Sequence, residues 1–205
     1  MNTYAEIFLI AALGYVLGSI PFALVIGKVF YQTDIRQYGS KNLGGGNAGR
    51  VLGKKAGLAV MTLDILKVTL AVFLASCLQD GEAAMILAGL AAAIGHCFPV
   101  FAHFKGGKAV ATMYGFLFGM ALFGGYGLSI FFLPLITFLI VLYLGKIIAL
   151  ASIASAVANT IYLFVITGGS LLFAASCIFT VVIIVRHKKN LIRIKNHEEN
   201  RISWM

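Results

Sequence analysis

A glycine-rich segment near the N-terminus carries the residue types that bind phosphate. It reads Gly39-Ser40-Lys41-Asn42-Leu43-Gly44-Gly45-Gly46-Asn47-Ala48-Gly49-Arg50. Glycines let the backbone approach a ligand closely and turn successive N–H groups toward an anion. Ser40, Asn42 and Asn47 could add neutral hydrogen bonds, and Arg50 offers a planar fork that matches a phosphate. The alternative is a flexible linker, but a linker has little use for two asparagines and an arginine so placed.

A second candidate anion site surrounds Gly106-Gly107-Lys108, with Lys105 directly before it and His96 further upstream. The two glycines and Lys108 are predicted to open a helix, whose first N–H groups and positive dipole end attract anions. The segment lacks the first glycine and the final Ser or Thr of a nucleotide-binding P-loop, so no nucleotide is expected. The alternative is a basic turn that only sets membrane topology, which explains the charge but not the paired glycines.

Two shorter segments complete the polar inventory. Ser152 follows the basic residue Lys146, and taken alone it is typical of helix packing. His187 and Asn190 are three residues apart and therefore share a helical face, where His187 could relay a proton near neutral pH. The alternative for this basic tail is a segment that binds anionic lipid. The cysteines and histidines show no metal-ligand spacing, so no metal is predicted.

Asp64 and Lys67 lie one helical turn apart within an apolar stretch. Ionisable groups are costly inside a membrane and are usually paired there. We therefore predict an internal ion pair that supports the site rather than one that takes part in the chemistry. The pairs Gly14 with Gly18 and Gly115 with Gly119 have the spacing of close helix packing.

Apolar stretches long enough to cross a membrane must position these segments. Hydrophobic residues make up 60% of the 205 residues and charged residues 11%, and a soluble domain with so little charge would expose large apolar patches and aggregate. The sequence predicts an all-α membrane protein, with one polytopic domain over 1–205. The expected seven transmembrane helices are 5–27, 57–78, 84–103, 109–124, 127–145, 147–167 and 169–186. The run Gly124-Gly125-Tyr126-Gly127 is the evidence for dividing 109–145, and six helices are the alternative.

The basic residues indicate which ends of these helices face the cytoplasm. Lys and Arg gather in 28–56, 105–108, 146 and the tail from 186, whereas the N-terminus and the loops near 79–83, 124–127 and 168–170 contain none. This alternation predicts an N-terminus outside, a C-terminus in the cytoplasm and active-site loops on the cytoplasmic face. The net charge of +9 is thus placed to meet lipid headgroups or anionic substrates, and no nucleic-acid partner is expected.

In their order and spacing from Gly18 to Glu199, these segments resemble the bacterial integral-membrane acyl-phosphate:glycerol-3-phosphate acyltransferase family. The resemblance implies transfer of a fatty acyl group from acyl phosphate to the 1-hydroxyl of glycerol 3-phosphate, giving lysophosphatidic acid and phosphate. It places this step of phospholipid biosynthesis in the bacterial inner membrane, without cofactor or metal. Membrane lipids are expected partners, as is contact with the enzymes that form acyl phosphate and that acylate the product.

By position, the resemblance assigns catalytic roles to Ser40, Arg50, Lys108, Ser152, His187 and Asn190. Substrate or phosphate binding is expected of Gly39, Asn42, Gly44, Asn47, His96, Lys105, Gly106 and Gly107. Arg50 and Lys108 would neutralise the two phosphates, and either His187 or a phosphate oxygen would take the hydroxyl proton. The chain departs from the family pattern at Lys41, Gly45 and Gly46, and at Ala149 and Ala151, which stand in place of serines.

Two other classes of protein would also have anion-binding sites on one face of the membrane. A transporter for a phosphorylated metabolite is one, although transporters usually place their sites near the membrane midplane. A non-catalytic relative that binds lipid precursor is the other. Transport into proteoliposomes would identify the first, and binding without turnover the second.

Overall fold

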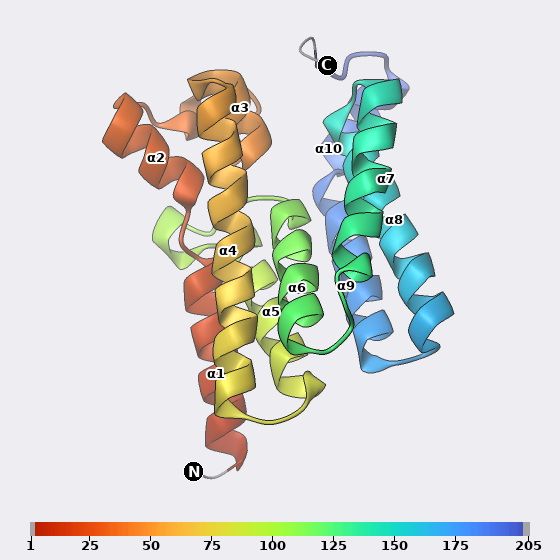
Figure 1. Cartoon of the computed structure of the whole chain (residues 1–205). Coiled ribbons are helices and arrows are strands. Elements are labelled where there is room, and N and C mark those ends of the chain that lie inside the picture. Colours follow the sequence, from red (N-terminus) through yellow and green to blue (C-terminus); the bar gives the residue numbers. More distant parts are fainter. Residues whose placement is uncertain (1–2, 203–205) are drawn as a thin grey trace.

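The computed structural model describes residues 3–202, which form helices and no strand (Figure 1). In chain order the elements are α1 (Thr3–Gly18), α2 (Phe22–Tyr31), η1 (Ile35–Gln37), α3 (Gly45–Leu52), α4 (Lys54–Leu78), α5 (Glu82–Cys97), η2 (Val100–Ala102), α6 (Val110–Phe123), α7 (Ser129–Gly145), α8 (Ile148–Thr167), α9 (Leu171–Arg186) and α10 (Lys188–Lys195). The predicted all-α class is confirmed.

Four helical segments are long and apolar enough to cross a membrane: Tyr4–Tyr31, Lys54–Leu78, Glu82–Ala102 and Ile148–Thr167. A fifth is reached if α9 and α10, which meet at a bend of 55°, count as one span, and α6 and α7 are shorter apolar helices. The protein is therefore a multi-pass membrane protein. The break predicted near Gly124–Gly127 is present, because α6 ends at Phe123 and α7 begins at Ser129. A count of seven spans stays a prediction.

The N-terminal segment differs from the single helix predicted over 5–27. Helix α1 ends at Gly18 and α2 begins at Phe22. The break precedes Pro21, which has no N–H to donate and disfavours helical geometry in the residue before it. The polar segment that follows was expected as a loop, yet it contains η1 and the eight-residue helix α3.

Small residues allow two pairs of helices to approach closely, as predicted. A Cβ added at Gly14 or Gly18 of α1 would lie 2.6 or 2.0 Å from the carbonyl oxygen of Ala88 or Ala92 on α5. Gly115 and Gly119 bring α6 equally close to α4. Helix α4 also packs against α1 and α5, so α1, α4, α5 and α6 form one group of helices.

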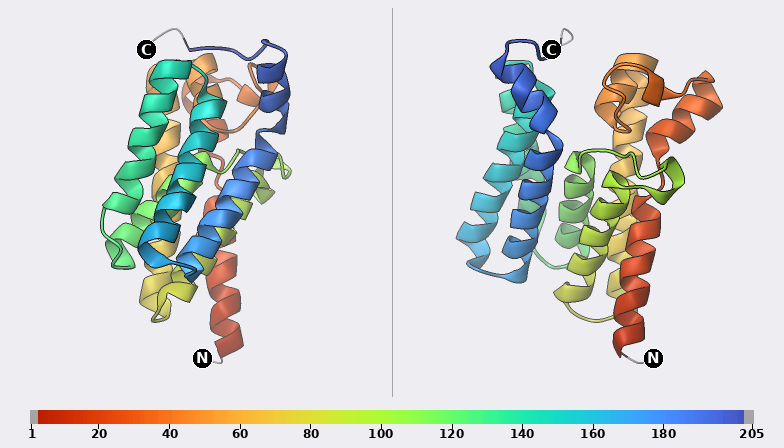
Figure 2. Two further views of the ribbon diagram at one scale, coloured as in Figure 1. Left: turned by 90° about the vertical axis from the view of Figure 1, so that its right-hand side faces the viewer. Right: turned by 180° about the vertical axis from the view of Figure 1, so that it is seen from behind.

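The polar segments gather at one end of the molecule. Helices α2 and α3, the loop between α7 and α8, and the C-terminal end lie there, whereas the N-terminal end of the chain lies opposite (Figures 1 and 2). Helices α7 to α10 stand beside the first group (Figure 1). A site between α3 and α10 is therefore assembled from both ends of the sequence.

Candidate active site

A cavity of about 260 Å³ lies at the polar end, between the first group of helices and the second. It gathers all six residues assigned catalytic roles from the sequence. Its lining comprises Gly39, Ser40, Asn42, Gly44, Gly45, Gly46, Asn47, Arg50, Met61, Asp64, His96, Lys108, Val110, Ala111, Phe138, Ile148, Ala149, Ser152, His187, Asn190, Arg193, Glu199 and Asn200. The cavity combines the glycine-rich segment, the loop before α6 and the C-terminal tail in one place.

Asn47 fixes the shape of the glycine-rich segment. Its Oδ1 accepts the N–H of Ser40 at 2.8 Å, and its Nδ2 donates to the carbonyls of Ile35 and Tyr38 at 3.1 and 3.3 Å. Both amide donors are therefore used within the protein, and the side chain is only 2% exposed. Asn47 therefore holds the loop, and because it also lines the cavity, its expected role in binding substrate stays a prediction. Gly39 is needed beside it, because at its φ of 58° a Cβ would lie 2.4 Å from the Asn47 Oδ1.

The first turn of α3 forms one wall of the cavity. Its cap residue Gly44 and its first residues Gly45 and Gly46 all line the cavity. The N–H groups of a first helical turn have no partner within the helix and favour an anion. Arg50 follows one turn after Gly46 and is an exposed member of the same lining. This wall can hold a phosphate by backbone and guanidinium together.

Lys108 is connected to the C-terminal tail by a chain of hydrogen bonds. Its Nζ donates to the Oδ1 of Asn190 at 2.6 Å, and the Nδ2 of Asn190 donates to Glu199 at 2.7 Å. Arg193 pairs with the other oxygen of Glu199 at 2.8 Å. Glu199 thus turns the amide of Asn190 so that its oxygen faces Lys108. No site role was predicted for Glu199, although it belongs to the family resemblance.

His187 presents a neutral acceptor to the cavity. Its Nδ1 lies 2.8 Å from the carbonyl oxygen of Ile183, and because a carbonyl only accepts, Nδ1 carries the proton and Nε2 is left as an acceptor. Burial, assisted by the nearby charge of Lys108, lowers the pKa of His187 to about 4. The imidazole is therefore uncharged at neutral pH and is a weak base.

Ser152 presents a hydroxyl oxygen rather than a free proton. Its Oγ donates to the carbonyl of Ile148 one turn earlier at 2.8 Å, which leaves the oxygen able to accept. Of the two alanines that replace family serines, Ala149 lines the cavity and Ala151 is buried away from it. Because Ala149 stands where the family pattern has a serine, the α8 side of the cavity has one hydroxyl fewer than that pattern.

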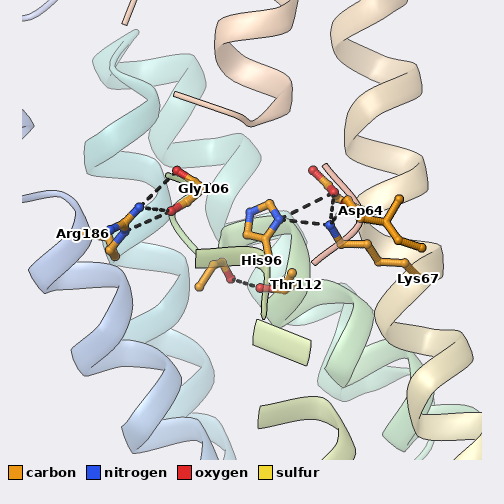
Figure 3. Close-up of polar contacts among 9 residues, drawn as sticks. Asp64, Lys67, His96, Gly106, Thr112 and Arg186 are labelled. Carbon is orange, nitrogen blue, oxygen red and sulfur yellow. Dashed lines mark hydrogen bonds and ion pairs between the residues drawn. The ribbon is translucent and has the colours of Figure 1, made fainter. Parts of the chain in front are cut away.

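The predicted ion pair of Asp64 and Lys67 is present (Figure 3), and Asp64 lines the cavity. The two side chains are 2.6 Å apart and 2% and 3% exposed. Lys67 also donates to the carbonyl of Ile20 at 2.8 Å and lies 3.2 Å from the Nδ1 of His96. The ammonium therefore satisfies a carbonyl that the break before Pro21 leaves without its helical partner.

Gly106, Gly107 and Lys105 do not occupy the places predicted for them. Helix α6 begins at Val110, and the N–H of Gly107 donates to the carbonyl of His96 at 2.9 Å instead of facing an anion. None of the three residues lines the cavity, and Lys105 is exposed. The two glycines are required for another reason: a Cβ on either would lie about 2 Å from an atom of His96. Of this segment, Lys108 alone reaches the cavity.

Arg186 is a contact residue that sequence reasoning did not find. Its guanidinium donates to the carbonyls of Gly106 and Gly107, directly before Lys108. In the sequence it is one more basic residue at the end of an apolar span. No local signal separates it from its neighbours, because its partners lie about eighty positions earlier.

The charge of Lys108 gives the site a predicted pH dependence. Burial lowers the pKa of Lys108 to about 8, against an opposing effect of Glu199 and with Arg193, Arg186 and Arg50 lowering it further. Above that pH the ammonium loses its charge, so kcat/KM for an anionic substrate should fall as pH rises through about 8. Steady-state kinetics between about pH 6 and pH 10 would measure this limb.

The control for the pH profile is Lys108→Arg, whose guanidinium stays charged throughout this range. Its profile should lack the alkaline limb even if its maximal rate is lower. No acidic limb is expected from His187 above about pH 5, because its pKa is about 4. A wild-type profile that stays flat beyond pH 9 would show that Lys108 does not act as a cation in this step.

The chain is similar in sequence to the proteins of one family. The profile of the family described as glycerol-3-phosphate acyltransferase matches residues 8–197. Proteins named glycerol-3-phosphate acyltransferase from Streptococcus pneumoniae strains CGSP14 and G54 (serotype 19F) are 44% and 45% identical over 201 residues, covering 94% of this chain and 91% of theirs.

Two crystal structures share the fold. Both are of PlsY (YgiH), an integral membrane glycerol 3-phosphate acyltransferase. The glycerol 3-phosphate form is 33% identical with a TM-score of 0.87, covering 96% of each chain. The lysophosphatidic acid form is 32% identical with a TM-score of 0.84, covering 96% of this chain and 95% of that one. The similarity therefore extends over nearly the whole chain.

Proposed function

The chain belongs to the glycerol-3-phosphate acyltransferase family, and we propose that it transfers a fatty acyl group from acyl phosphate to the 1-hydroxyl of glycerol 3-phosphate. The products are lysophosphatidic acid and inorganic phosphate. One observation carries this proposal: a single cavity at one end of a membrane bundle holds two anion-binding groups and a neutral acceptor. These are Lys108, the α3 wall with Arg50, and the Nε2 of His187.

The two anion-binding groups suit two phosphorylated substrates. The α3 wall and Arg50 bind one phosphate, and Lys108 on the facing side binds the other. Charges fixed in advance around developing negative charge are an effective way to lower a barrier. They also bring the hydroxyl and the acyl carbon together, which converts an encounter into a reaction within one complex.

The chemical step needs no activated nucleophile from the protein. The glycerol oxygen attacks the acyl carbon, the bond from that carbon to the phosphate oxygen breaks, and phosphate leaves with the electron pair. With its pKa of about 4, His187 is suited to accept a hydrogen bond and orient the hydroxyl. A phosphate oxygen, whose second pKa is about 6, is the better proton acceptor.

The membrane and the placement of charge decide where the substrates enter. Lys and Arg gather at the end that holds the cavity, so we place this end in the cytoplasm, where glycerol 3-phosphate is available. The acyl chain of the donor extends from the cavity between helices on the membrane side. The N-terminus then lies outside.

Purified protein in detergent tests this proposal directly. With glycerol 3-phosphate and palmitoyl phosphate, we expect equimolar release of phosphate and formation of lysophosphatidate. With palmitoyl-CoA, turnover should be lower on the order of 100-fold or more, because the thioester has no phosphate at the acyl carbon for the anion site to stabilise. Phosphate release and thin-layer separation of the lipid product measure the two.

Omitting glycerol 3-phosphate gives the control for hydrolysis of the donor. Turnover from palmitoyl-CoA at the rate of palmitoyl phosphate would refute the donor assignment while keeping the acyl acceptor. A folded sample with no turnover from any donor would favour the alternatives. Uptake of labelled glycerol 3-phosphate into proteoliposomes would then identify a transporter.

A further inference from the structure

The backbone directly before Lys108 is held by a charged group from a distant helix. The Nε of Arg186 donates to the carbonyl of Gly107 at 3.0 Å. Its Nη2 donates to the carbonyls of Gly107 and Gly106 at 2.8 and 3.1 Å (Figure 3). The same Nη2 reaches the carbonyl of Cys97 at 3.4 Å. One guanidinium therefore joins two backbone carbonyls of the α5–α6 connection, and the last carbonyl of α5, to the end of α9.

The backbone conformation of this segment is one that needs support from surrounding contacts. Phe104 and Ala109, on either side of it, have φ of 58° and 63°, a left-handed conformation that disfavours residues with a side chain. Such conformations persist where surrounding structure fixes them, and they gather at functional sites. Here Arg186 fixes the segment before Lys108, and the Thr112 hydroxyl fixes the carbonyl of Ala109 after it at 3.0 Å.

The opposite side of the segment packs against His96. The carbonyl of His96 accepts the N–H of Gly107 at 2.9 Å, and the imidazole touches the glycine so closely that no Cβ would fit. Arg186 also lies over the ring of Phe98 at 5.2 Å, which limits the directions in which its fork can point. The Gly106–Gly107 backbone is thus held between α5 and α9.

We propose that Arg186 is a positioning residue for the acyl transfer, which holds Lys108 where its ammonium meets the substrate phosphate. This inference rests on the proposed function. Gly107 is bonded directly to Lys108, so a shift of the Gly107 carbonyl also moves Lys108. The Lys108 ammonium, which donates to Asn190 at 2.6 Å, would then be displaced. A displacement of about 1 Å in a positioned group can lower a rate about 100-fold.

A simpler reading is that Arg186 only marks the cytoplasmic end of a span, as basic residues often do. Lys188 and Lys189, two and three positions later, carry the same charge and are exposed. A topology role would make these three residues equivalent. The bonds from the guanidinium to Gly106 and Gly107 predict that they are not.

The test compares Arg186→Ala and Arg186→Lys with Lys188→Ala as the matched control. Arg186→Ala should lower kcat/KM for glycerol 3-phosphate about 30- to 100-fold, and added guanidinium at millimolar concentration should restore it at least about 10-fold. Arg186→Lys should be intermediate, because an ammonium cannot make the fork. Lys188→Ala should stay within about two-fold of wild type.

The pH profile supplies a readout that a purely structural role would not change. The charged groups that act on Lys108 are Glu199, which raises its pKa, and Arg193, Arg186 and Arg50, which lower it. Removing Arg186 should therefore move the alkaline limb of kcat/KM to higher pH. Lys108→Ala should show no rescue by guanidinium, because the missing group is then an ammonium in the cavity.

Two results would overturn the inference. The first is an Arg186→Ala variant with kcat/KM within about three-fold of wild type. The second is an Arg186→Ala variant that is folded, as its melting temperature shows, and that loses activity with no rescue by guanidinium and no shift of the alkaline limb of kcat/KM.

If Arg186→Ala does not fold, the same comparison is decided on Arg186→Lys. If wild type has no turnover, the proposed function fails, and calorimetric binding of glycerol 3-phosphate to the same variants still tests Arg186: unchanged affinity would overturn it.

Discussion

Replacing Lys108 with alanine should lower kcat/KM for glycerol 3-phosphate by about 100- to 1,000-fold, the loss seen when one preorganised group that stabilises transition-state charge is removed. Lys108 lines the cavity, and its ammonium is the group that can bind a phosphate there. Among the described residues, the only hydrogen-bond partner of this ammonium is the amide oxygen of Asn190 at 2.6 Å. Removing it also leaves that oxygen without its donor. Initial rates of phosphate release, with lysophosphatidate quantified in parallel, measure the effect.

Lys105→Ala is the matched control for this variant. Lys105 belongs to the same connection and carries the same charge, but it is exposed and does not line the cavity. Because an exposed charge contributes little, its loss should change kcat/KM by less than about two-fold. Equal losses in the two variants would mean that the segment acts by its total charge and not through one placed ammonium.

Gly106→Ala should strongly reduce turnover and destabilise the protein. The added Cβ would lie 2.0 Å from the carbonyl oxygen of His96 and 2.8 Å from that of Cys97. Both contacts are with backbone, so no side chain can turn aside, and the connection that carries Lys108 must shift. Such overpacking costs about 1–3 kcal/mol of folding free energy, and the displaced ammonium should lower kcat/KM by about 100-fold or more. Thermal unfolding in detergent and the acyl-phosphate assay measure the two losses.

Gly169→Ala provides the comparison. Gly169 lies in the short connection between α8 and α9, its φ is not in the left-handed region, and an added Cβ would meet nothing within 4 Å. Its melting temperature and kcat/KM should match those of wild type. Full activity in Gly106→Ala would show that the connection is looser than these contacts imply, and would weaken the account of how Lys108 is placed.

The sequence by itself determined the class of the molecule and the ingredients of its site. With 11% charged residues among long apolar runs, the chain has no way to fold in water, so the membrane and the all-α class follow from composition. The division of 109–145 followed from glycines that end a helix, and the ion pair of Asp64 and Lys67 followed from helical spacing. These features are local, because helical hydrogen bonds and neighbouring turns lie within a few residues of one another.

Several other roles were decided only by the tertiary structure. The amide of Asn47 holds the loop by donating to the carbonyls of Ile35 and Tyr38, a role that its sequence neighbourhood did not indicate. Gly106 and Gly107 were expected to face an anion, yet they are packed against His96. Each of these residue types can either contact a ligand or support the backbone. Which role it has depends on the groups from elsewhere in the chain that pack beside it.

Arg186 and Glu199 show why such choices cannot be made from sequence. The guanidinium of Arg186 has its partners about eighty positions earlier. Glu199, although it pairs with the nearby Arg193, acts on the site through an amide that only the fold turns toward Lys108. The partners of Arg186 are a pair of carbonyls from the α5–α6 connection, and the amide bound by Glu199 is that of Asn190. Composition and helical periodicity determine which segments cross the membrane, while the packing of α9 and α10 against the first group of helices determines where the charge of Lys108 is held.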